Sequence, residues 1–121
     1  MGYRSDVCIA LTRQGREALK QLLTSLNRTE AKALRGFLSA ADFHRVDTKT
    51  KAAVWLWRNI KWYEESETLP EVYQLAQLLR GLALEDYRFL RLGEYPDDVE
   101  DQGQFFDTPF DLHIVREIVV K

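Results

Sequence analysis

The most apolar stretch of the chain is residues 52–63, with the sequence AAVWLWRNIKWY, and it holds all three tryptophans. Successive side chains of a β-strand point to opposite faces, so a strand here has two different sides. One side carries Val54, Leu56, Arg58, Ile60 and Trp62, and the other carries Trp55, Trp57, Asn59, Lys61 and Tyr63. We predict that the first side faces the core, that Trp62 is buried and that the strand is internal to a sheet. The second side is aromatic with polar tips, so either another layer of the protein or a partner covers it.

Shorter patterns predict the elements of the amino-terminal half. Apolar and polar side chains alternate over residues 3–11, which predicts a strand that pairs with the tryptophan strand. Leucines at helical spacing predict a helix over residues 12–26 with Thr12 as its N-cap, and a second helix follows a capping box formed by Asn27 and Glu30. Residues 43–51 are polar, and they either lengthen the central strand or form a loop that leads into it.

The carboxy-terminal half predicts one helix and two strands. Residues 64–67 form a polar turn, after which Thr68 as cap and Pro70 in the first turn predict a helix that ends near Gly81. Residues 87–94 and 111–121 predict strands, separated by a loop over residues 95–110. The whole chain, residues 1–121, is expected to be a single α+β domain, with helices packed on one face of a roughly four-stranded, mainly antiparallel sheet and the element order β-α-α-β-α-β-β.

The composition, 45% hydrophobic and 30% charged, is that of a globular domain. No apolar run approaches the ~20 residues that span a bilayer, and no signal peptide is visible, so we expect a cytoplasmic protein without a membrane span. Cys8 is the only cysteine, which excludes an internal disulfide and a cysteine-built metal site. We expect no metal and no cofactor.

The two halves of the chain differ strongly in charge. Residues 1–63 contain 12 Lys and Arg against 5 Asp and Glu, whereas residues 64–121 contain 5 against 14. The net charges are therefore +7 and −9. Either the halves fold together and neutralise each other, or one half presents a charged face to a partner.

The acids concentrate between Arg91 and Arg116, where no Lys or Arg occurs. The seven acids of this segment are Glu94, Asp97, Asp98, Glu100, Asp101, Asp107 and Asp111, and the aromatic residues Tyr95, Phe105, Phe106 and Phe110 lie among them. A calcium loop is not expected, because Pro109 stands where such a loop needs a bidentate glutamate. The segment is either a solvated loop or an acidic docking surface with aromatic anchors, which pairs with a basic partner or imitates nucleic-acid phosphates.

Other candidates for chemistry are few. His44 and His113 have no second metal ligand at a suitable spacing, and Cys8 has no basic neighbour that favours the thiolate. Catalytic glycine-rich, nucleophile-elbow and zinc-helix motifs are absent. Arg13, Arg16 and Lys20 share one helix face and form a basic surface. Together with Trp55, Trp57 and Tyr63, this surface would bind single-stranded nucleic acid by base stacking if those rings are exposed.

Three segments carry a resemblance to known sequences: YRSDV at residues 3–7, NIKWY at residues 59–63 and YRFLRLGE at residues 87–94. With the acids that follow, the chain resembles a group of small accessory proteins encoded by phages and prophages, most of them without an assigned function. The resemblance implies an accessory phage protein, a class that includes inhibitors of host defence acting by direct protein binding.

We therefore expect a non-enzymatic protein-binding accessory protein, a phage inhibitor of a host defence system that acts through its acidic surface in the bacterial cytosol. Its expected partner is a bacterial host protein of basic character. The alternative is a small nucleic-acid-binding domain that uses the basic amino-terminal half, although the acidic half argues against strong binding of nucleic acid. An enzyme is the third interpretation, and the sequence leaves the oligomeric state open.

Overall fold

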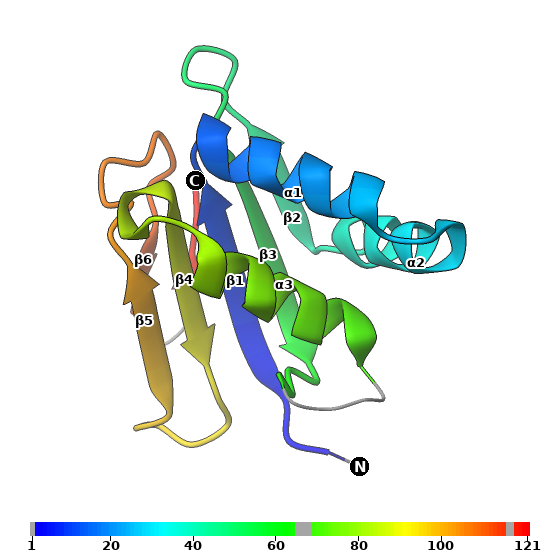
Figure 1. Cartoon of the computed structure of the whole chain (residues 1–121). Coiled ribbons are helices and arrows are strands. Elements are labelled where there is room, and N and C mark those ends of the chain that lie inside the picture. The colour runs from blue at the N-terminus through cyan, green and yellow to red at the C-terminus, as the bar shows by residue number, and fades with distance from the viewer. Residues whose placement is uncertain (1, 65–68, 116–117) are drawn as a thin grey trace.

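Five antiparallel strands form the main sheet of the computed structural model, which describes residues 2–64, 69–115 and 118–121 (Figure 1). The strand order is β2-β3-β1-β4-β5, made of β1 (Ser5–Leu11), β2 (Phe43–Val46), β3 (Ala53–Ile60), β4 (Tyr87–Leu92) and β5 (Val99–Gly103). The helices are α1 (Arg13–Ser25), α2 (Arg28–Ser39) and α3 (Pro70–Gly81), followed by the short 3-10 helix η1 (Leu84–Asp86). β6 (His113–Ile114) and β7 (Ile118–Val119) form a separate two-stranded sheet.

The predicted α+β class and the mainly antiparallel sheet are confirmed, but the sheet has five strands where four were expected. Residues 43–46 make a strand of their own, and β5 lies inside the segment predicted to be a loop. β3 and β4 lie on either side of β1 and are joined through α3, which is the split β-α-β arrangement. β5 escaped prediction because its sequence, VEDQG, has one apolar side chain and therefore no alternating pattern.

The helix signals in the sequence are confirmed at two of three starts. The Thr12 side chain accepts the Gly15 N–H at the start of α1, and Asn27 and Glu30 form the predicted capping box of α2. α3 begins at Pro70, as the proline predicts, but its N-cap is Leu69, whose side chain makes no capping hydrogen bond, in place of the predicted threonine cap. Residues 65–68, including the predicted polar turn and the Thr68 cap, lie outside the described residues.

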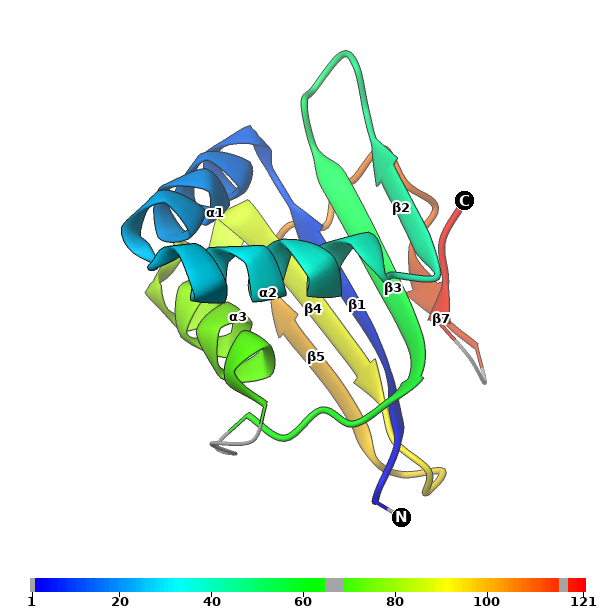
Figure 2. The same ribbon diagram turned by 90° about the vertical axis from the view of Figure 1, so that its right-hand side faces the viewer.

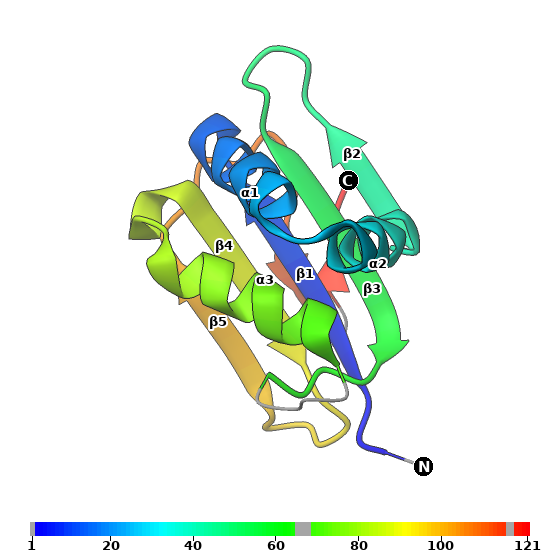
Figure 3. The ribbon, with the colours of Figure 1, turned by 45° about the vertical axis from the view of Figure 1, so that its right-hand side comes forward.

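Both faces of the sheet are buried over its three inner strands. Figure 3 shows α1, α2 and α3 over one face, here called the helix face. On this face Val7, Ile9, Trp55 and Trp57 pack against helical leucines. The opposite face, here called the C-terminal face, packs Cys8, Ala10, Val54, Leu56 and Leu90 against Phe110 and Ile118. Figure 2 shows β7 on the side of the sheet away from the helices. The aromatic side of the tryptophan strand is thus covered by a layer of the protein itself.

Trp62 is buried as predicted, but on the helix face and not on the side of Val54. A β-bulge reverses the alternation, because Arg58 and Asn59 of β3 together stand opposite Asp6 of β1. Asn59 adopts a left-handed conformation with φ 57°. The two backbone N–H groups at the bulge are satisfied by carboxylates: Asp42 accepts from Arg58 at 2.7 Å, and Asp6 accepts from Asn59 at 2.8 Å.

The end of the chain differs from the single strand predicted over residues 111–121. β6 and β7 are short and pair with each other, with residues 116–117 between them outside the described part of the chain. Their apolar residues cover the C-terminal face, where Ile118 is fully buried. The apolar residues of the predicted strand therefore cover the sheet and do not form one of its strands; they are Leu112, Ile114, Ile118 and Val120.

Replacing Trp62 tests its role in the core. Its ring packs against those of Phe37, Trp57 and Phe89, so Trp62→Ala is expected to lower the free energy of unfolding by about 3–5 kcal/mol. The control is Tyr73→Ala, because Tyr73 is 49% exposed on α3 and its loss should cost less than about 1 kcal/mol. Urea denaturation followed by circular dichroism measures both. Equal stability of the two variants would contradict the packing.

The bulge predicts a different kind of sensitivity at Asn59. A β-branched residue is strained at positive φ, so Asn59→Val is expected to destabilise the protein by about 1–3 kcal/mol. Asn59→Gly should be close to neutral, since glycine adopts this conformation without strain. Thermal melting of the two variants gives the comparison, and a Val variant as stable as the Gly variant would rule out the bulge.

Candidate functional site

The acidic segment is built around the β4–β5 hairpin, where arginines of β4 stand beside acids of β5. Arg88 makes a two-point contact with Asp101, with N–O distances of 3.1 and 3.0 Å. Arg91 donates from Nε to Glu100 at 2.6 Å and from its terminal nitrogens to both oxygens of Asp98 at 2.5 and 3.1 Å. Three of the seven acids therefore have counter-charges on the adjacent strand, so much of the repulsion that the sequence suggests is removed within the chain.

Arg91 is the centre of this network. Its side chain is only 13% exposed, and it also donates to Ser5 Oγ at 3.0 Å, which links β4 to β1. Burial acts against its charge, but the hydrogen bonds to Asp98 and Glu100 outweigh burial and raise the pKa of the guanidinium. Arg91, followed by the Tyr3 hydroxyl, lowers the pKa of Asp98. The pair is therefore ionised across the physiological range.

The amino-terminal residues fasten the turn between β4 and β5. The Tyr3 hydroxyl donates to Asp98 Oδ2 at 2.6 Å and accepts the Tyr95 N–H at 3.2 Å, while the Arg4 N–H donates to Glu94 at 2.9 Å. Gly93 allows this close approach, since a Cβ there would lie 2.0 Å from the Asp98 carboxylate. The turn is thus held by contacts from residues far away in the sequence.

The other acids of the segment lack an arginine or lysine partner within the described part of the chain. Glu94 accepts only a backbone N–H, Asp111 lies 3.5 Å from His113, and Asp97 and Asp107 are exposed. Glu94 and Asp97 are both in the β4–β5 turn. These two carboxylates remain available to a basic group from outside.

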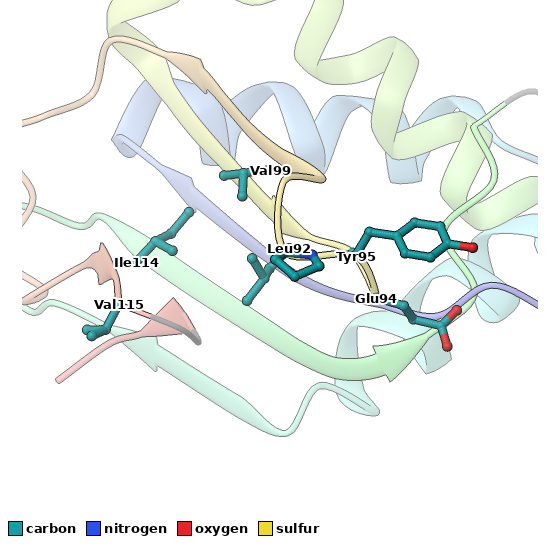
Figure 4. Close-up of a pocket in the computed structure, with 8 residues that line it drawn as sticks. Leu92, Glu94, Tyr95, Val99, Ile114 and Val115 are labelled. Atoms are coloured by element: carbon teal, nitrogen blue, oxygen red, sulfur yellow. The ribbon is translucent and has the colours of Figure 1, made fainter.

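An apolar groove lies beside this turn, between the β4–β5 hairpin and the β6–β7 hairpin. We call it the hairpin groove; it has a volume of about 610 Å³ and is lined by Leu92, Gly93, Glu94, Tyr95, Pro96, Val99, Ile114 and Val115. Figure 4 shows Leu92, Val99 and Ile114 around a common space, whereas the Tyr95 ring extends away from it. Val99 and Val115 are 45% and 64% exposed, which is high for valine.

A smaller hollow of about 230 Å³ adjoins the hairpin groove and shares Leu92, Gly93 and Glu94 with it. Its other lining residues are Arg4, Ser5, Asp6 and Asn59. All seven come from three segments of the sequence, residues 3–7, 59–63 and 87–94. These segments, distant in sequence, meet at one end of the sheet, and the Tyr63 hydroxyl adds a 3.0 Å bond to the Tyr3 carbonyl there.

The structure divides the aromatic residues of the acidic segment. Phe110 is buried and Phe105 packs against the C-terminal core, so both fold back onto the protein. Phe106 is 65% exposed beneath the Arg88 guanidinium, and Tyr95 is 67% exposed against the Tyr3 ring. Two of these aromatics are therefore accessible and two are structural.

The alternative aromatic face is not assembled on the surface. Trp55 and Trp57 are 7% and 2% exposed, and the Trp57 indole donates to the Phe37 carbonyl of α2 at 3.0 Å. Of that set, Tyr63 alone reaches the surface, at 36% exposure. The two tryptophans are consequently core residues and have no free ring face on which a nucleic-acid base could stack.

The remaining candidate groups have structural surroundings. Burial raises the pKa of the Cys8 thiol to about 12, so it is protonated at physiological pH. The His44 ring stacks on the Trp55 ring, with the ring centroids 4.8 Å apart, and its Nδ1 lies 3.1 Å from the Val54 carbonyl oxygen. Among the described residues, no three His, Cys, Asp or Glu side chains are arranged to hold a metal ion. Within the same residues, no helix has the length and apolar character needed to cross a membrane.

The chain matches no known protein-family model, and neither curated proteins nor solved structures give a significant match. A fold alone does not identify a function, since one topology serves many activities. The groove, the hairpin and their charges are therefore the features that indicate a function.

The sequence located the acidic segment, predicted as a loop, but neither the β4–β5 hairpin nor the groove next to it. Leu92 and Val99 belong to the hairpin, and Ile114 comes from the chain end, so no single pattern unites them. The one available signal was Val99, a lone aliphatic residue in a run of acids.

The Asp98 carboxylate gives a pH-dependent prediction. Its pKa is lower in the folded protein than in the unfolded chain, so its stabilisation is complete above the usual aspartate range and disappears as the pH falls through the lowered value. Asp98→Asn is therefore expected to be less stable than the wild type at neutral pH, by about 1 kcal/mol or less. At strongly acidic pH the two proteins should have equal stability.

Urea denaturation at a series of pH values measures the difference. Asp97→Asn is the matched control, because Asp97 is exposed and its carboxylate takes no part in the hairpin network of the described residues. A pH-independent difference between Asp98→Asn and the wild type would contradict the ion pair with Arg91.

Proposed function

We propose that the protein is a non-enzymatic protein-binding accessory protein whose partner docks at the hairpin groove. The observation that carries this proposal is the exposure of Val99 and Val115 on either side of an apolar groove. The same protein buries both tryptophans of β3, so exposed valines at this position are a contrast. Large aliphatic side chains left uncovered around a concave surface are typical of interaction sites.

The charges beside the groove indicate the chemistry of the partner. Glu94 lines the groove and Asp97 lies in the same turn, and neither has a Lys or Arg side chain bound to it in the described structure. A partner segment that places an apolar side chain in the groove and Lys or Arg beside these acids matches both features. Opposite charges at the rim mainly accelerate association, while the buried apolar contact supplies most of the affinity.

The resemblance to phage accessory proteins supports the class of partner. A phage inhibitor of host defence acts on a bacterial protein in the host cytosol, and proteins that bind nucleic acid do so through basic surfaces. We therefore propose a basic bacterial defence protein as the target. The hollow next to the groove is lined by the three resembling segments, which supports this end of the sheet as the working surface.

Nucleic-acid binding is the less favoured proposal. The basic residues of α1 and α2 remain exposed, but the stacking surface that this function required is absent because Trp55 and Trp57 are buried. A contact to phosphates alone would be weak and salt-sensitive.

Selection of ligands from a random peptide library on the immobilised protein tests the docking site. Enriched peptides are expected to contain an aliphatic or aromatic residue flanked by Lys or Arg. Val99→Asp should weaken their binding about tenfold or more, because it places a charge beside the apolar groove. Fluorescence anisotropy with the labelled peptides measures the dissociation constants.

Tyr73→Asp is the control, since Tyr73 has a similar exposure of 49% but lies on α3. It should leave peptide binding unchanged. A second pair of variants, Glu94→Gln and Asp97→Asn, should slow association at low salt with little effect at high salt. Enriched peptides that are acidic, or that bind Val99→Asp as tightly as the wild type, would overturn the proposal.

A further inference from the structure

β5 is an edge strand, and no strand of the described residues pairs with its outer side. The hydrogen bond at the turn end of the β4–β5 ladder fixes which backbone groups point outward. Gly93 N–H donates to the Asp98 carbonyl at 2.8 Å, in register with the ladder; at the other end the register shifts by one residue, because Phe105 N–H donates to the Tyr87 carbonyl at 3.1 Å. Because the pattern alternates along an antiparallel pair, Glu100 and Gln102 face β4, whereas Val99 and Asp101 direct their backbone groups away from it. The Val99 N–H donates to the Asp97 carbonyl at 3.1 Å, so Asp101 supplies the outward N–H of these two residues.

The side chains of β5 also divide between the two faces of the sheet. Val99 stands opposite Leu92 and Asp101 opposite Leu90, so both lie on the C-terminal face beside the hairpin groove. Asp98 and Glu100 lie on the helix face, where Arg91 holds them. The free edge therefore has one side that leads into an apolar groove and another side that carries carboxylates.

We propose that the hairpin groove is one half of a site for an extended peptide segment that adds to β5 as a sixth strand of the sheet. This inference rests on the proposed function and names the form of the ligand: a strand in which apolar residues alternate with Lys or Arg. Apolar side chains on one face of that strand enter the groove beside Val99, and basic side chains on the other face lie next to Glu100, which Arg91 also binds. The backbone N–H and carbonyl of Asp101 and the carbonyl of Val99 provide the ladder bonds, and the alternation provides specificity.

The same charges act against pairing between two copies of the protein. Two β5 edges would bring Glu100 and Asp101 of one copy close to those of another, and the repulsion that their partners Arg91 and Arg88 leave uncompensated is unfavourable in adjacent strands. A basic strand meets attraction at the same position. The edge is also already ordered, because Arg88 and Arg91 bind acids of β5 and Tyr3 binds Asp98 in the turn. Little conformational entropy is therefore lost when a ligand binds.

Two synthetic peptides of identical composition test the inference: one alternates Lys and Val, and the other has all its Lys before all its Val. The alternating peptide is expected to bind about tenfold or more tightly than the block peptide. It should also slow amide hydrogen exchange at Asp101 by a similar factor, measured by NMR. The Glu100 amide, which faces β4 in the free protein, is the internal control.

A pair of variants separates the backbone group from the carboxylate. Asp101→Pro removes the outward N–H and should abolish the preference for the alternating peptide, while Asp101→Ala keeps the N–H and should retain that preference. The NMR spectrum of each variant establishes that it is folded, and an N-methyl group on alternate residues of the peptide makes the same test on the wild-type protein.

Each outcome bears on one of the two proposals. If both peptides bind equally and shift the resonances of Leu92 and Ile114 without protecting the Asp101 amide, the strand addition is overturned and the groove remains a docking site. If neither peptide binds while the library-selected peptides do, the strand addition is again overturned. Failure of the library selection itself, with no response to Val99→Asp, overturns the proposed function.

Discussion

The fold depends on β1 being central to the sheet and apolar on both of its faces. β1 pairs with β3 on one side and β4 on the other, so its side chains have no route to solvent at either edge. Val7, Ile9 and Leu11 need a cover on the helix face, and Cys8 and Ala10 need one on the opposite face. A sheet with such a strand at its centre must be covered by two layers.

The two covers are unequal, and the hairpin groove follows from that inequality. Three helices, each at least 12 residues long, cover the helix face, whereas the C-terminal face is covered by strands of two residues and the loop before them. The small side chains Cys8 and Ala10 let Phe110 and Ile118 pack closely against the middle of the sheet. This short cover does not reach the end of the β4–β5 hairpin, so Val99 and its neighbours remain accessible there.

Much of the fold could be predicted from the sequence because its strongest signals are local. The helices follow from leucine spacing and from caps such as Asn27, and β3 follows from the tryptophans. The errors came from contacts between different strands. The bulge at Asn59, whose N–H is accepted by Asp6 of another strand, moves Trp62 to the opposite face of the sheet. Asp98 is not an unpaired acid, because Arg91 of the neighbouring strand β4 binds it. Neither partner is visible until the register of the sheet is known.

The ion pairs of the hairpin also decide what kind of recognition this surface can support. Arg88 binds Asp101, and Arg91 binds Asp98 and Glu100, so these three carboxylates are already paired and stabilise the hairpin. A partner that relied on charge alone would have to compete with these short internal bonds, and exposed ion pairs contribute little. Apolar burial meets no such competition, because Val99 and Val115 are exposed in the free protein. In the proposed complex, the charges of the hairpin would mainly order an edge and attract the ligand, while the groove beside it would provide the area that retains it.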